Sequence, residues 1–120
     1  MRFKTSQQCF EEAQQMYNYS AVVSAAGDNV VIPAPGLGRR IVLVYALVQN
    51  TTANATTLAL FQNTSASSFF RWLLQTTGNG VEWIAVLGRE GRMGENNAVG
   101  IWLSGANACN VNLYYFVEDV

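Results

Sequence analysis

Residues 109–118, Cys-Asn-Val-Asn-Leu-Tyr-Tyr-Phe-Val-Glu, alternate in polarity more regularly than any other stretch of the chain. One parity holds Val111, Leu113, Tyr115 and Val117, and the other holds Asn110 and Asn112. Successive side chains of a β-strand point to opposite faces of its sheet, so this pattern predicts a strand with one buried and one polar face.

Short runs rich in Val, Leu, Ile, Thr and aromatic residues precede this stretch, separated by clusters of Gly, Pro, Asn and Ser. The runs cover residues 20–25, 29–32, 39–49, 56–62, 69–76, 81–87 and 98–103. Their even spacing, with no helical period after residue 19, predicts an all-β fold: a single antiparallel, jelly-roll-like β-sandwich of about eight strands over residues 20–120. The predicted core contains Leu43, Leu58, Leu60, Ile101, Val111 and Leu113.

Residues 1–19 differ in composition from the rest of the chain. They are rich in Gln and place apolar residues at helical spacing, which predicts an N-terminal arm or one short helix. Their basic start is followed by Thr-Ser-Gln-Gln instead of an apolar segment, so we expect no secretory signal and synthesis in the cytoplasm. Cys9 and Cys109 lie far apart in the sequence, and the parity of Cys109 favours an inward-facing free thiol over a disulfide.

The composition is apolar and poor in charge. Hydrophobic residues make up 50% of the 120 residues and charged residues 12%, where an average soluble domain has about 25% charged residues. Either part of the surface is covered by a partner, or Thr, Asn and Ser keep it soluble without charge. Residues 41–48 are apolar on both faces, which is typical of a central strand or of one covered by a neighbouring subunit. With a net charge of −1, no basic cluster and no long apolar run, neither nucleic acid nor a membrane is an expected partner.

The residues of common catalytic sites are missing from the sequence. The chain has no histidine, which excludes Ser-His-Asp and Cys-His catalysis and most zinc sites. The spacing of the acidic residues Asp28, Glu82, Glu90 and Glu95 does not pair two carboxylates for glycoside hydrolysis. We therefore expect a protein that is not an enzyme and that uses no cofactor or metal.

Residues 84–94 resemble a strand followed by a glycine-rich phosphate-binding loop. The glycine spacing is GxxGxxG, however, and another strand follows where a dinucleotide-binding unit would begin a helix. The sequence therefore predicts a long, flexible loop between strands. Its charged residues Arg89, Glu90, Arg92 and Glu95 either pair locally or contact a partner subunit.

Some aromatic side chains must lie on an outer face of the sandwich. Trp102 has the opposite parity to Ile101 and Leu103, and Trp72 the opposite parity to Leu73. An outward-facing Trp serves either as an anchor in a subunit interface or as a stacking platform for a sugar. We favour the interface.

Two stretches of the chain resemble small bacteriophage structural proteins. Residues 30–43, Val-Val-Ile-Pro-Ala-Pro-Gly-Leu-Gly-Arg-Arg-Ile-Val-Leu, are similar to a Pro-Ala-Pro-Gly turn that leads into a long apolar strand in those proteins. Residues 93–99, Met-Gly-Glu-Asn-Asn-Ala-Val, followed by Leu-Ser-Gly at 103–105, resemble a second segment near the end of such chains. The likeness extends loosely over residues 30–117.

This resemblance implies a head-decoration, or cement, protein on the exterior of a virion. It would form a homotrimer and bind the major capsid protein of a bacteriophage-type head. The alternative function is a receptor- or carbohydrate-binding head domain of a phage fibre. The residues expected at interfaces are Phe3, Phe10, Met16 and Tyr17 in the arm, together with Arg39, Arg40, Trp72, Arg89, Arg92 and Trp102.

Overall fold

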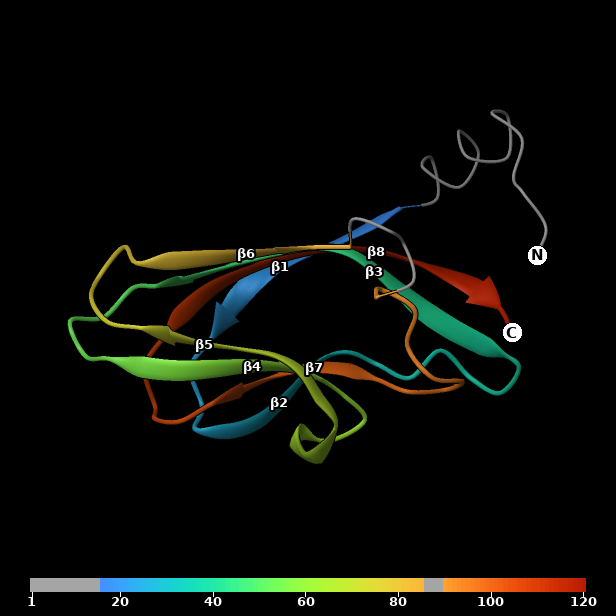
Figure 1. The fold of residues 1–120 in the computed structure, drawn as a ribbon, viewed down its shortest axis with the longest axis horizontal. Coiled ribbons are helices and arrows are strands. Elements are labelled where there is room, and N and C mark those ends of the chain that lie inside the picture. The colour runs from blue at the N-terminus through green and yellow to red at the C-terminus, as the bar shows by residue number, and fades with distance from the viewer. Residues whose placement is uncertain (1–15, 86–89) are drawn as a thin grey trace.

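Two four-stranded antiparallel sheets pack face to face in the computed structural model, which describes residues 16–85 and 90–120. Sheet A has the strand order β1-β8-β3-β6 and sheet B the order β2-β7-β4-β5; they form the upper and lower layers in Figure 1. In chain order the described elements are β1 (Tyr17–Val23), β2 (Gly27–Ile32), β3 (Arg39–Asn50), β4 (Thr56–Gln62), the 3-10 turn η1 (Ser65–Ser67), β5 (Ser68–Leu74), β6 (Gly80–Ile84), β7 (Val99–Leu103) and β8 (Cys109–Asp119).

The pairing is that of one long hairpin rolled up on itself. β1 pairs with β8, β2 with β7, β3 with β6 and β4 with β5, all antiparallel. The roll is closed within each sheet by β3 pairing with β8 and β4 with β7. This is a jelly-roll arrangement, so the predicted all-β fold is confirmed.

The core lies between the two sheets and is built almost entirely from aliphatic side chains. All six residues predicted for it are buried, and Leu113 at its centre has no exposed surface. The alternation in β8 is confirmed as far as Tyr114, after which Tyr115 to Glu118 are all intermediate in exposure. The fully or nearly buried core residues are Val23, Val31, Ile32, Ile41, Leu43, Ala46, Val48, Leu58, Leu60, Leu74, Met93, Val99, Ile101, Leu103, Cys109, Val111 and Leu113.

Cys109 is a free, buried thiol, as its parity predicts. Burial raises the pKa of this thiol above its ordinary value, because the thiolate would lose its hydration there. The thiol is therefore a small apolar core group rather than a nucleophile.

The first two strands begin earlier than the sequence predicts. β1 starts at Tyr17, inside the segment assigned to the arm, because Tyr17 to Tyr19 pair with β8. β2 starts at Gly27, where the sequence predicts a turn. Gly27 has a φ of +86°, and the Asn29 amide donates to the carbonyl of Ala25, so the turn geometry is present. The pairing of β2 with β7 nevertheless extends over these residues.

The segment after residue 90 is not the flexible loop that the sequence predicts. The Leu43 amide donates to the Gly91 carbonyl at 2.7 Å, and the Met93 amide to the Ile41 carbonyl at 2.9 Å. Met93 is 3% exposed. The segment thus pairs with the first half of β3 along the same edge that β6 occupies further on, which helps to bury a strand that is apolar on both faces.

Candidate binding surfaces

The outer face of sheet A carries aromatic, aliphatic and amide side chains and almost no charge. Residues that pair across antiparallel strands project from the same face, so the register defines three rows across the four strands. The face that we call the tyrosine face consists of Asn18, Tyr114, Tyr45 and Ile84 in the first row, Ser20, Asn112, Leu47 and Glu82 in the second, and Val22, Asn110, Gln49 and Gly80 in the third.

Apolar surface is left open to solvent on this face. Val22 is 59% exposed, Ile84 53% and Tyr114 40%. The rings of Tyr45 and Tyr114 lie 6.0 Å apart between centroids, in a tilted arrangement that aromatic pairs prefer. A hollow of about 370 Å³ between β1, β8 and β3 is lined by residues that include Leu47 and Asn112.

Glu82 carries the one carboxyl group among the residues of the tyrosine face, and it is hydrogen-bonded to Tyr45. Burial, together with the charge of Glu82 and a hydrogen bond to it, raises the pKa of the Tyr45 hydroxyl. The Tyr45 hydroxyl donates this hydrogen bond to Glu82. A charge-depleted centre with tyrosine is the composition of a protein–protein interface.

An ion-pair cluster borders one end of sheet A. Glu118 on β8 accepts from Arg40 Nε at 2.7 Å and from Arg92 Nε at 3.2 Å, and its side chain is 17% exposed. Arg39 and Asp119 form a looser, exposed pair at 3.9 Å. Arg40 and Arg92 are therefore both paired within the subunit. Of the loop residues expected to pair locally or with a partner subunit, Arg92 is thus paired within the chain, to a carboxylate on β8.

We expect replacement of Glu118 by Gln to lower the free energy of unfolding by about 1 kcal/mol, because two guanidinium groups lose a partly buried counter-charge. The loss should shrink as salt screens the charges. Urea titrations at low and high ionic strength measure it. The matched control is Asp119→Asn, whose exposed pair should contribute less than about 0.5 kcal/mol. Equal effects of the two changes would contradict a structural role for the cluster.

On the outer face of sheet B, Trp102 lies under an arginine. Trp102 and Arg71 both pair with Ala59 from opposite sides, and the Arg71 guanidinium sits 5.0 Å from the centroid of the indole ring. This cation–π contact covers Ala59, which has no exposed surface. The outward parity predicted for Trp102 is correct, and its ring is half-buried by this contact.

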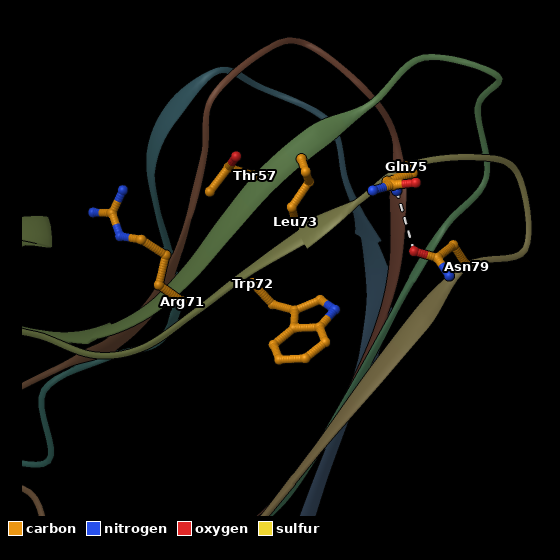
Figure 2. A pocket seen from close by; sticks show the side chains of 6 residues that line it. All are labelled: Thr57, Arg71, Trp72, Leu73, Gln75 and Asn79. Carbon is orange, nitrogen blue, oxygen red and sulfur yellow. Dashed lines mark hydrogen bonds between the residues drawn. The ribbon is translucent and has the colours of Figure 1, made fainter.

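Trp72 lies at the open edge of the sandwich. It pairs with the core residue Leu58 and so shares the inward parity, yet it is 50% exposed because β5 is the edge strand of sheet B. Its ring is parallel to that of Phe70, with 6.3 Å between the centroids. A shallow groove of about 620 Å³ follows this edge (Figure 2). It is lined by Thr57, Arg71, Trp72, Leu73, Gln75 and Asn79.

A third hollow, of about 210 Å³, lies where β1 begins. Tyr17 and Tyr115 line it with rings 5.5 Å apart, beside Pro33 and Arg39. Tyr17 is 55% exposed and Met16 37%. Burial and the neighbouring Tyr17 raise the pKa of the Tyr115 hydroxyl.

Those residues predicted for interfaces that the structure describes do not form one surface. Trp72 and Trp102 lie in strands of sheet B, Arg39 and Arg40 lie at the start of β3, and Arg92 lies beside β3, where it pairs with Glu118. Phe3, Phe10 and Arg89 lie outside the described residues. Sequence reasoning missed the tyrosine face, because strand order and the register shift in β3 together bring Tyr45 and Tyr114 side by side.

Within residues 16–85 and 90–120, no three His, Cys, Asp or Glu side chains come together as a metal site. No helix among these residues is long and apolar enough to span a membrane. No protein-family model matches the chain, and no curated protein is significantly similar to it in sequence.

Proposed function

We propose that this chain is a virion structural protein, a decoration subunit that binds and stabilises the shell of a bacteriophage-type head. The observation that carries the proposal is the tyrosine face: a nearly uncharged surface on the outside of a β-sandwich, with half-exposed Ile84, Val22 and Tyr114. The resemblance of residues 30–43 and 93–105 to small phage structural proteins supports the same function.

Association with further copies of the chain would remove this apolar surface from water. Burial of apolar area contributes about 25 cal/mol per Å², and a cyclic assembly hides such a face without open-ended growth. The proposed assembly is a homotrimer in which the tyrosine face of each subunit packs against a neighbour. The ion-pair cluster around Glu118 lies at the border of this face, where an interface tolerates charge.

The oligomeric state tests the assembly. We expect the full chain to scatter light as a trimer at micromolar concentration and Ile84→Lys to shift it to the monomer, because a lysine charge would be buried in the interface. The matched control is Val30→Lys, at a similarly exposed residue on the edge strand β2 of the other sheet. A monomeric wild-type protein, or an Ile84→Lys protein that stays trimeric, would contradict this assembly.

Shell attachment needs a separate test. Virus particles that contain the chain should hold it at a copy number comparable to that of the major shell protein, as measured by quantitative mass spectrometry.

Deleting residues 1–15 should weaken attachment to the shell and leave the sandwich folded. The deletion stops at residue 15 because β1 begins at Tyr17. Particles that lack the chain would overturn the decoration function, and unchanged attachment of the deletion would remove residues 1–15 from it.

A further inference from the structure

The groove along β5 combines an exposed indole with unused hydrogen-bonding groups. Half of the Trp72 side chain is open to solvent, and the parallel Phe70 ring beside it limits how the indole can turn. A large aromatic surface that is fixed and exposed is costly in water, and it offers a stacking platform to a ligand with a flat apolar face.

Amide groups gather at one end of this platform. The backbone N–H of Gln75 donates to Asn79 Oδ1 at 3.1 Å, which fixes the Asn79 amide and leaves its Nδ2 to donate elsewhere. Figure 2 shows the nitrogen edge of the Trp72 indole on the side where Gln75 and Asn79 lie. Among the described residues, the Trp72 indole N–H, Asn79 Nδ2 and the Gln75 side-chain amide have no protein partner.

The charged side chain that lines the groove already has a partner. Arg71 lines the groove, but its guanidinium is stacked on Trp102 on the outer face of sheet B. Among the residues that the structure describes, no carboxylate lines the groove. The ligand that fits is therefore neutral, has one flat apolar face, and carries several hydroxyl groups around its edge.

We propose that this groove is a saccharide-binding site, in which a neutral sugar ring stacks on Trp72 and its hydroxyls bind the indole N–H, Asn79 and Gln75. An open site with one platform binds weakly, with a dissociation constant on the order of 1 mM per site. Several copies in one assembly would raise the apparent affinity for a polysaccharide through multivalency. The site shares no residue with the tyrosine face, although Asn79 adjoins Gly80 of that face, and it does not depend on the proposed decoration function.

An array of neutral oligosaccharides, probed with the full-length protein, tests the proposal. We expect a defined set of glycans to be retained and the best of them to change the tryptophan fluorescence in solution. Trp72→Ala should weaken binding at least about 10-fold, whereas Trp72→Tyr should retain much of it, because a phenol ring still stacks. Asn79→Ala should cost roughly 2- to 10-fold, the equivalent of one hydrogen bond.

Tyr114→Ala is the matched control, since it removes an exposed aromatic ring from the tyrosine face. It should leave the dissociation constant for a single oligosaccharide in solution unchanged, even where a loss of oligomers lowers the apparent affinity on the array. Trp72→Ala should leave the oligomeric state unchanged, so the two proposals fail independently. Retention of no glycan, or glycan binding that survives Trp72→Ala, overturns the site. A third result also overturns the site: the wild-type protein binds no glycan, and the Trp72→Ala protein no longer forms oligomers. The β5 edge would then be a contact between subunits.

Discussion

Truncation of Leu113 to alanine is expected to lower the free energy of unfolding by about 2–5 kcal/mol. Leu113 has no exposed surface and lies on the central strand β8, paired with Ala46 on one side and Tyr19 on the other. Because both neighbouring strands are fixed by their own hydrogen bonds, the core cannot collapse fully into the space that the lost methyl groups leave. The free energy of unfolding therefore falls by the transfer free energy of the removed methyl groups and, in addition, by the cost of the cavity that they leave.

Chemical denaturation of the two proteins measures this difference, provided that the slope of the transition is unchanged. Leu37→Ala is the matched control, since it makes the same chemical change at a leucine that is 83% exposed. It should alter the free energy of unfolding by less than about 0.5 kcal/mol. A similarly small effect at Leu113 would show that the inward parity of β8 is misassigned.

The sequence was sufficient to predict the architecture because parity is a local property. The alternation in residues 109–113 and the buried parity of Ile101 identify inner faces without any knowledge of which strands are neighbours. Strand ends were predicted less well. Gly27 and Asn29 have the chemistry of a turn, yet β7 provides partners for both, and tertiary pairing decides where the strand begins.

The binding surfaces depend on which strands are neighbours in each sheet, and the alternation of residues along one strand does not reveal this order. The outward direction of Trp102 was predictable, but its cover, Arg71, comes from a strand two positions away in the sheet. Trp72 is exposed although its parity is inward, because β5 has no neighbour on one side. The contact of Tyr45 with Tyr114 also needs the β-bulge between Leu43 and Tyr45, which shifts the register.

Gly100 is the position where an added methyl group is expected to be most disruptive among the central strands. It lies in β7 on the outer face of sheet B, where it pairs with Phe61 in β4, and both residues are buried. A Cβ there would meet the Phe61 ring and would lie 2.6 Å from the backbone carbonyl oxygen of Asn29 in β2. The ring can shift slightly, but the carbonyl belongs to a paired strand and cannot move without breaking the ladder.

Gly100→Ala should therefore lower the free energy of unfolding by about 1–3 kcal/mol, the usual cost of overpacking. This loss exceeds the gain of roughly 0.5–1 kcal/mol that alanine brings by restricting the unfolded chain. The control is Gly105→Ala, where the new methyl group meets only the end of the Asn107 side chain at 3.1 Å.

A double-mutant cycle with Phe61→Leu separates the two contacts of the new methyl group. If the ring is the main obstacle, Phe61→Leu will cost less in the Gly100→Ala protein than in the wild type, because the smaller side chain makes room for the methyl group. If the Asn29 carbonyl dominates, the two changes will be additive and the loss will appear as weakened protection of β2 amides from hydrogen exchange. A Gly100→Ala protein as stable as the wild type would mean that β2 and β4 do not approach β7 as closely as the register places them.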